Sequence, residues 1–247
     1  MDSSMVSRTP PPLSSMLQGG PVALFLDFDG TLVELAPGPD AISPAADLAS
    51  RLSRLSNRLE GRCALISGRA IVDIERHLGS LPIAAAGSHG SDRRSADGRS
   101  IGPGPTGLPL SIEARLRAYA AREGLQYENK PHGGAIHYRA HPDKGDAAQA
   151  FAKNLAGECG WAVQNGKFVV ELVATRAGKG EAVLAFMNEP PFAGARPYFI
   201  GDDLTDEAGF TMCEGLGGAG ILVGHRPRTE ARYRLAGVGS VHDWLEL

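Results

Sequence analysis

The sequence is short of the features that mark several classes of protein. Its 247 residues include three cysteines, which are scattered and lack CxxC spacing, so neither a disulfide framework nor a cysteine-rich zinc site is expected. No segment approaches the roughly 18 apolar residues that span a bilayer. The net charge of −3 and the lack of a stripe of basic and aromatic residues argue against nucleic acid or a membrane as partner. We therefore expect a cytoplasmic protein with reduced thiols.

The beginning of the chain contains serine, proline and an early arginine but no apolar signal core. We expect residues 1–20 to form a flexible N-terminal tail. A hydrophobic content of 43% is enough for a full core in one or two domains. The 32 glycines and 17 prolines are spread between periodic segments, which indicates many tight turns.

Strands and helices alternate over residues 21–107, and the alternation resumes over 177–247. Leucines spaced by four and three between 48 and 59 predict an amphipathic helix, with Ser43 as its cap and Pro44 as its first residue. A second helix is predicted over 71–78, ended by a glycine. Strands are predicted at 22–26, 63–66, 83–86, 198–200 and 220–223. This alternation predicts an α/β fold with a doubly wound, Rossmann-like parallel sheet.

The pattern changes between these two parts of the chain. Residues 91–108 are rich in turn residues, and a helix, two strands, a helix and two further strands are predicted after them. The last two strands flank Asn165-Gly166, a strong hairpin signal. We expect residues 108–176 to form a smaller α+β domain, inserted as a cap into a core made of 21–107 and 177–247.

Two aspartates follow the first predicted strand, in the sequence Asp27-Phe28-Asp29-Gly30-Thr31. Open parallel sheets bind ligands at the carboxyl ends of their strands. Crowded carboxylates repel each other, and a divalent cation would relieve the repulsion. The alternative is an ordinary polar exit from a strand, since aspartate and glycine are common in turns.

Three more polar features lie at junctions between predicted strands or helices and the loops beside them. They are Ser67, Lys179 and the pair Asp202-Asp203. Taken singly, Ser67 could be a helix cap, Lys179 a solvated loop residue, and the acids the start of a helix. Taken together on one sheet edge, they supply a metal site, a hydroxyl and a cation. This set of groups is suited to phosphoryl transfer.

The order of the motifs DFDGT, SGR, GKG and GDDLTDE resembles that of the haloacid dehalogenase-like (HAD) phosphatase superfamily, and the inserted α+β unit resembles its cap. More narrowly, GSHG, Lys130, His137-Tyr138-Arg139 and GKFVVEL look like the trehalose-6-phosphate phosphatase family. The resemblance covers the chain from about Val22 onward. It implies a phosphatase of trehalose biosynthesis that releases trehalose from trehalose 6-phosphate.

The resemblance also implies a role for each core residue. Asp27 would attack phosphorus and carry an aspartyl-phosphate, and Asp29 would be the general acid and then the base. Ser67 and Lys179 would bind phosphoryl oxygens. The cofactor Mg²⁺ would be held by the side chains of Asp27 and Asp202 and by the backbone carbonyl of Asp29, with Asp203 or Asp206 in support.

Specificity would lie with the cap and with loops near it. The residues expected to bind the sugar phosphate are Gly68, Arg69, His89, Gly90, Lys130, His137, Arg139 and Glu171. Each has the alternative of an ordinary surface or strand-face position. We expect His137 and Arg139 to share one strand face. Glu171 interrupts an apolar strand, which favours a functional role because an unpaired buried carboxylate is costly. Segments near 105–108 and 174–178 would act as hinges.

Two small departures affect only the specificity that the resemblance implies. Val173-Ala174 stands where the family often has proline, and Asp92 stands where glutamate is usual. One alternative is a capped phosphatase for another sugar phosphate, such as sucrose phosphate. A second is a non-catalytic sugar-phosphate sensor, which loss of Asp27, Asp29 or Lys179 would have favoured. We expect a monomer.

Overall fold

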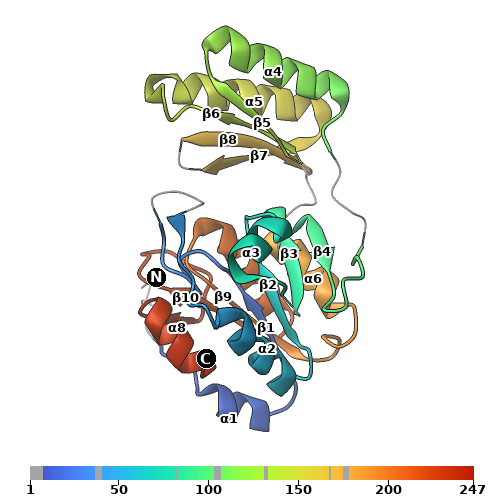
Figure 1. Ribbon diagram of the computed structural model, residues 1–247, viewed down its shortest axis with the longest axis vertical. Helices are drawn as coiled ribbons and strands as arrows, with labels where there is room; N and C mark the ends of the chain where they lie inside the picture. Colours follow the sequence, from blue (N-terminus) through green and yellow to red (C-terminus); the bar gives the residue numbers. More distant parts are fainter. Residues whose placement is uncertain are drawn as a thin grey trace, which may run out of the picture. The chain divides into compact units, whose positions relative to one another are not determined.

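The structure, a computed structural model, describes residues 8–36, 41–81, 83–102, 107–130, 133–166, 168–174 and 178–247. The chain divides into two compact units, whose elements are labelled in Figure 1. The larger unit comprises Met1–Pro103 and Gly178–Leu247, and the smaller comprises Gly104–Ala177. In the part of the chain that the structure describes, no helix is long and apolar enough to cross a membrane.

The larger unit contains a seven-stranded sheet in the order β11-β10-β9-β1-β2-β3-β4. Every neighbouring pair is parallel except β3 and β4. The strands are β1 (Val22–Leu26), β2 (Cys63–Ile66), β3 (Ala84–Gly87), β4 (Asp92–Arg94), β9 (Arg196–Gly201), β10 (Ala219–Val223) and β11 (Tyr233–Leu235). The predicted doubly wound α/β fold is confirmed.

Helices cover both faces of this sheet, and each face has its own hydrophobic core. Val22, Leu24 and Leu26 of the fully buried β1 belong to one core, and Ala23 and Phe25 belong to the other. A central strand with two covered faces therefore needs an uninterrupted apolar sequence. The first core takes in α1 (Leu13–Gln18), α2 (Leu48–Arg58), α3 (Ile71–Leu78) and α8 (Val238–Leu245), and the second takes in α6 (Lys179–Met187) and α7 (Glu207–Gly215).

The order of the strands reverses at β1. This strand pairs with β2 on one side and with β9 on the other. The connections from β1 and β9 therefore lead away in opposite directions, and the loops that follow the two strands leave a crevice between them. Asp27 follows β1 directly and Asp202 follows β9 directly, so the topology brings these two carboxylates to one place.

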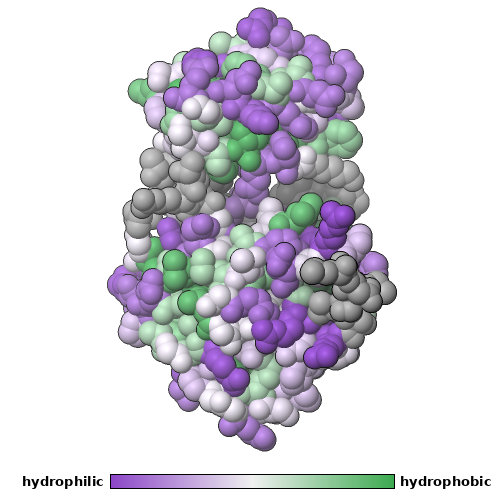
Figure 2. All heavy atoms as spheres, turned by 180° about the vertical axis from the view of Figure 1, so that it is seen from behind, coloured by the Kyte–Doolittle hydropathy of each residue, from purple (hydrophilic) through white to green (hydrophobic). Residues whose placement is uncertain are grey.

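The smaller unit is an antiparallel sheet, ordered β5-β6-β8-β7, with α4 and α5 on one face (Figure 1). Its elements are α4 (Leu110–Glu123), β5 (Gln126–Lys130), β6 (Gly133–His137), α5 (Gly145–Cys159), β7 (Trp161–Gly166) and β8 (Val169–Ala174). Ile136, Val170 and Leu172 face the helices in one core. Figure 2 shows hydrophilic side chains over much of the visible surface of this unit. Arg115 of α4, for example, pairs with Glu158 of α5 at 2.6 Å.

Part of the N-terminal segment is not a flexible tail, contrary to our expectation. Residues Leu13–Gln18 form α1, and Leu13 and Met16 are buried in the first core. The Trp244 indole also donates a 2.8 Å hydrogen bond to the Pro11 carbonyl. Apolar side chains spaced three apart therefore fix this segment to the larger unit. Residues 1–7 lie outside the described residues.

Other differences concern element boundaries. Helix α2 begins at Leu48, so Ser43 and Pro44 are not its first residues. Residues Asp92–Arg94, which we expected in a turn-rich excursion, form β4 against β3. The hinge segments expected near 105–108 and 174–178 fall partly outside the described residues.

Candidate active site

The first motif forms a tight turn at the end of β1. The Asp27 backbone amide continues the pairing with β9, donating to the Ile200 carbonyl at 2.9 Å, and the Asp27 side chain is buried. Gly30 has a φ of +74°, and a Cβ built on it would lie 2.2 Å from Asp202 Oδ2. Only glycine combines this conformation with this closeness, so the Asp202 carboxylate lies directly against the first motif.

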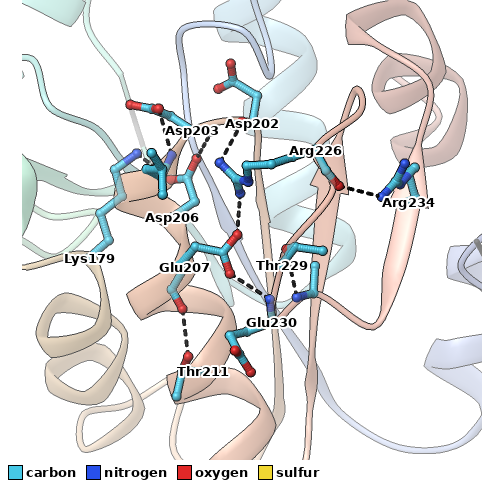
Figure 3. Close-up of polar contacts among 12 residues, drawn as sticks. Lys179, Asp202, Asp203, Asp206, Glu207, Thr211, Arg226, Thr229, Glu230 and Arg234 are labelled. Atoms are coloured by element: carbon cyan, nitrogen blue, oxygen red, sulfur yellow. Dashed lines mark hydrogen bonds and ion pairs between the residues drawn. The ribbon is translucent and has the colours of Figure 1, made fainter. Parts of the chain in front are cut away.

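Three carboxylates gather around one buried ammonium group at this edge of the sheet. Oxygen atoms of Asp27, Asp202 and Asp206 all lie within 4.8 Å of one another. Lys179 Nζ lies 2.8 Å from Asp27 Oδ1 and 2.5 Å from Asp206 Oδ1. Lys179 is 3% exposed because it is the first residue of α6, which packs into the second core. Figure 3 shows the side chains of Lys179 and Asp206 pointing toward each other.

Asp206 has a more central place than the sequence indicated. Residues Leu204–Asp206 form a short 3-10 turn, which returns the Asp206 side chain to Lys179. Its second oxygen accepts a 2.8 Å hydrogen bond from the Asp203 amide. Asp203 is exposed and caps the same turn by accepting from the Leu204 amide at 2.7 Å. Of the two residues expected to support the metal site, Asp206 belongs to the carboxylate cluster itself.

The electrostatics of the cluster favour a divalent cation. Burial, followed by the neighbouring Asp206, raises the pKa of Asp27 well above its usual value. Burial and the charges of Asp206 and Asp203 raise the pKa of Asp202 to about 6. Burial alone would lower the pKa of Lys179, but its two carboxylate partners raise it, so Lys179 stays charged. Three carboxylates against one ammonium leave excess negative charge.

The donor set of the cluster fits Mg²⁺. All of the candidate ligands are carboxylate oxygens, which suit a hard cation. In addition, Asp202 Oδ1 is buried and has no hydrogen-bond partner among the described residues. A buried, unpartnered carboxylate oxygen is costly, and a bound cation would satisfy it.

Asp29 points to a different partner. Both of its carboxylate oxygens accept hydrogen bonds from Arg69, at 2.6 Å from Nε and 2.8 Å from Nη2. Arg69 also contacts Asp73 at 3.2 Å, and the hydrogen bonds that Arg69 donates to Asp29 raise the pKa of its guanidinium. The structure thus joins a predicted general acid to a predicted substrate-binding residue.

The second motif and the GSHG segment are held together by backbone hydrogen bonds. The His89 amide donates to the Ser67 carbonyl at 2.9 Å, and the Ser88 amide donates to the Arg69 carbonyl at 2.7 Å. Ser88 and His89 both have positive φ values, of 52° and 56°. Such strained residues concentrate at functional sites. A Cβ on Gly68 would lie 2.6 Å from His89 Cε1, so the imidazole lies over Gly68.

Two further predicted residues belong to the same region. Ser67 is 1% exposed, and its hydroxyl accepts a 3.1 Å hydrogen bond from the Arg69 amide. Gly90 has a φ of +95°, and a Cβ there would lie 2.5 Å from the Gly178 carbonyl oxygen. The GSHG segment is thereby placed beside the start of α6, and so beside Lys179.

The smaller unit carries a separate polar cluster on the face of its sheet that α4 and α5 do not cover. Glu171 is 7% exposed, and its Oε1 lies 2.5 Å from Lys130 Nζ. Its Oε2 is buried without a hydrogen-bond partner among the described residues. His137 Nε2 lies 2.8 Å from Glu128 Oε2. Alternation along the strands brings these side chains to one face, opposite Ile136 and the core.

Arg139 does not join this face as we expected. Strand β6 ends at His137, and Arg139 is exposed in the turn that follows. Tyr138 between them is buried in the core of the smaller unit and continues the alternation, which ends when the chain turns at Arg139. The sequence analysis also missed Glu128, although the alternation of Glu128 with Lys130 in β5 could have revealed it.

Comparison with known proteins identifies the family. A family model described as trehalose-phosphatase matches residues 25–238. The trehalose-6-phosphate phosphatase of Escherichia coli (strain K12) is 39% identical over 230 residues, covering 91% of this chain and 85% of that protein. A probable trehalose-phosphate phosphatase of Sinorhizobium fredii (strain NBRC 101917 / NGR234) is 42% identical over 206 residues, covering 82% and 77%.

Solved structures agree in fold. A trehalose-6-phosphate phosphatase related protein has a TM-score of 0.70 at 25% identity, covering 91% of this chain and 95% of that one. A HAD-superfamily phosphatase from Bacteroides thetaiotaomicron has a TM-score of 0.67 at 12% identity, covering 100% and 96%. The HAD fold and the resemblance found in the sequence are confirmed. The chain belongs to the trehalose-phosphatase family, and it is a phosphatase.

Proposed function

We propose that this protein hydrolyses trehalose 6-phosphate to trehalose and inorganic phosphate, through an aspartyl-phosphate and with Mg²⁺ as cofactor. The observation that carries the proposal is the buried cluster in which oxygens of Asp27, Asp202 and Asp206 lie within 4.8 Å of one another beside Lys179. The names of the relatives support the choice of substrate.

In the first step Asp27 is the nucleophile. One of its carboxylate oxygens forms a bond to phosphorus, and the bond between phosphorus and the sugar oxygen breaks with its electron pair on that oxygen. Asp29 gives its proton to the departing oxygen. The Ser67 hydroxyl donates to a phosphoryl oxygen, and Lys179 offsets the charge of the carboxylates around it. The products are trehalose and the phosphorylated Asp27.

In the second step Asp29 is the base. Its carboxylate takes a proton from water, whose oxygen attacks phosphorus, and the bond to Asp27 breaks. Phosphate leaves and the Asp27 carboxylate returns. Because Arg69 holds both oxygens of Asp29 in the resting state, we propose that the incoming phosphoryl group competes for this guanidinium and frees Asp29.

The Asp27 and Asp202 side chains and the Asp29 carbonyl would hold Mg²⁺, with the Asp206 carboxylate beside them. The bound ion would neutralise charge on the phosphoryl group. The buried, unpartnered Oδ1 of Asp202 supports this assignment.

We propose that the smaller unit is the specificity cap. A disaccharide is recognised by hydrogen bonds to its hydroxyl groups. A ligand without these hydroxyls would leave polar groups of the site unpaired, so it would bind much more weakly. Glu171 offers a buried acceptor without a partner among the described residues, and Lys130 and His137 lie on the same face. In the larger unit, His89 and Gly90 are proposed as substrate-binding residues, because the GSHG segment lies beside Ser67 and the start of α6.

We further propose that the protein acts as a cytoplasmic monomer. Its cysteines are unpaired in the structure, and burial raises the pKa of the Cys63 thiol to about 12. Such a thiol is unreactive and needs no oxidising compartment. Sedimentation analysis of the purified protein measures the oligomeric state.

Trapping the phosphorylated enzyme tests the mechanism. The variant Asp29→Asn keeps an oxygen that can accept from Arg69 but lacks the base of the second step. Because Asp29→Asn also lacks the acid of the first step, the trapping substrate is a small aryl phosphate, whose leaving group departs without a proton. After acid quenching of this variant with that ester and Mg²⁺, mass spectrometry should find one phosphoryl group on the peptide that contains Asp27. Asp27→Asn is the matched control and should carry none. An active parent whose Asp29→Asn variant never accumulates phosphate on Asp27 would contradict the aspartyl-phosphate.

A further inference from the structure

A second polar network lies next to the carboxylate cluster and is centred on Glu207. Glu207 is the first residue of α7 and directly follows Asp206, but its carboxylate takes no part in the cluster. One oxygen accepts a hydrogen bond from Arg226 Nη2, and the other accepts from the Glu230 amide at 2.7 Å. Figure 3 shows Glu207 between these two partners. The start of α7 is thus tied to the loop that follows β10.

Arg226 extends this network to the candidate metal site. Its other terminal nitrogen, Nη1, lies 3.4 Å from the backbone carbonyl oxygen of Asp202 (Figure 3). One planar guanidinium therefore joins the Glu207 carboxylate to the Asp202 main chain, and its fixed fork sets their separation. The backbone of Arg226 is itself held, because its carbonyl accepts a 3.2 Å hydrogen bond from Arg234.

The Asp202 side chain depends on such support. Its Oδ1 has no hydrogen-bond partner in the part of the chain that the structure describes, and its Oδ2 would lie 2.2 Å from a Cβ on Gly30. Because the Asp202 carboxylate is packed this closely and held by few hydrogen bonds, its orientation is set mainly by the position of its own main chain. A shift of the Asp202 main chain would therefore move a metal ligand.

We infer that Arg226 is a positioning residue of the metal site, which fixes the Asp202 backbone against Glu207 so that the Asp202 carboxylate faces Asp27 and Asp206. The inference rests on the proposed function, since it assigns Arg226 to the metal site of that proposal. Arg226 touches no reacting group and acts through Asp202. Groups that orient metal ligands typically change metal affinity by 10- to 100-fold when removed.

The same helix offers a matched control. Arg232 pairs with Glu214, near the other end of α7, as Arg226 pairs with Glu207 at its start. Both arginines come from the segment after β10, but the Arg232 side chain is 53% exposed and that of Arg226 is 18% exposed. Among the residues that the structure describes, the partners of the Arg232 side chain are Glu214 and Tyr233, which lie outside the loop that carries Asp202.

The test measures Mn²⁺ binding to the full-length protein without substrate, by electron paramagnetic resonance of the free ion. Arg226→Met should raise the Mn²⁺ dissociation constant about tenfold. Arg226→Lys should recover part of the affinity, because an ammonium can reach one of the two oxygens but cannot bridge them as a fork. Arg232→Met should bind as the parent does. Thermal unfolding confirms that each variant is folded.

A folded Arg226→Met that binds Mn²⁺ as tightly as the parent would overturn the inference, and so would an equal loss in Arg232→Met. If Arg226→Met does not fold, Glu207→Gln replaces it, since it weakens the hold on Arg226 while keeping an acceptor for the Glu230 amide. Its Mn²⁺ affinity should fall in the same direction, and parental affinity would overturn the inference. A parent that binds no Mn²⁺ would instead overturn the metal site of the proposed function.

Discussion

Neutralising Asp202 should stabilise the metal-free protein at neutral pH. Burial and the neighbouring carboxylates of Asp206 and Asp203 raise the pKa of Asp202 to about 6. A folded-state pKa above the unfolded value means that the folded state binds the proton more tightly. The stability that this residue contributes is therefore present at low pH and is lost as pH rises from about 4 through about 6. Asp202→Asn removes the charge while keeping the shape.

The size of the effect follows from the shift in pKa. A rise from 3.8 to about 6 corresponds to about 3 kcal/mol at 1.4 kcal/mol per unit. Asp202 is half-buried, and solvent screening reduces this to about 1–2 kcal/mol. In a domain of this size that is a rise of about 4 °C in melting temperature at pH 7.5. At pH 4.5 roughly half of the advantage should remain, since the Asp202 carboxyl of the folded state is then partly protonated and the repulsion is weaker.

Thermal unfolding in the presence of a chelator, at pH 4.5 and 7.5, measures both values. Asp143→Asn, an exposed aspartate of the smaller unit, is the control and should show no pH-dependent difference from the parent. Added Mg²⁺ should then reverse the order, because the parent gains a ligand-bound state that Asp202→Asn forms poorly. Two results would refute the claim that repulsion between neighbouring carboxylates destabilises the folded state. One is an Asp202→Asn variant that is no more stable than the parent at pH 7.5. The other is a variant whose gain in stability is the same at both pH values.

Three further substitutions test other parts of the site. Glu171→Ala should lower kcat/KM for trehalose 6-phosphate by about 100-fold or more but leave hydrolysis of a small aryl phosphate nearly unchanged; equal losses would make Glu171 structural. Lys179→Met leaves two buried carboxylates without their ammonium partner and should lower the free energy of unfolding by about 3–5 kcal/mol, measured with denaturant. A loss below about 1 kcal/mol would contradict the ion pairs of Lys179 with Asp27 and Asp206. Gly30→Ala forces a Cβ toward Asp202 and should weaken Mn²⁺ binding as well as stability. If that variant binds Mn²⁺ as tightly as the parent, the Asp202 carboxylate can move away from the added Cβ without loss of the metal site, which would contradict this prediction.

The main features of the fold were predictable from the sequence because the core imposes them. Strand β1 lies between two cores, so its apolar run could not be mistaken for a solvent-facing strand. The helix of spaced leucines and the existence of the hairpin between β7 and β8 were similarly clear, but Asn165 and Gly166 lie within β7 and the chain reverses after them. The start of α2 was not predicted correctly. Ser43-Pro44 is a local signal for a helix start, but the helix begins at Leu48, where the leucines begin to pack. Strand β4 was missed since its charged sequence, Asp92–Arg94, has no apolar period.

The residues of the carboxylate site were predictable from the sequence, but the orientations of their side chains were not. Spacing along the chain placed Asp27, Asp29 and Asp202 at one sheet edge, as their positions after β1 and β9 show. It could not reveal that the Asp29 side chain turns to Arg69, which is 40 residues away. Nor could it reveal that a 3-10 turn brings Asp206 back to the cluster. Such choices depend on partners that only the folded chain brings together.

Arg226 illustrates the same limit. It lies in a loop among other basic residues, and nothing in the local sequence sets it apart. Its acceptors are Glu207, 19 residues away, and Asp202, 24 residues away. Only the pairing of β10 with β9 brings this loop to the end of β9.

Phosphate release from a panel of phosphate esters, measured with Mg²⁺ and with a chelator, tests the central claim most directly. The panel contains trehalose 6-phosphate, sucrose phosphate, a hexose phosphate and a small aryl phosphate. We expect rapid release from trehalose 6-phosphate, strongly preferred over release from the other sugar phosphates and abolished by the chelator. Preference for a different sugar phosphate would contradict the assigned specificity, and the absence of metal-dependent release from every ester would contradict the proposed function.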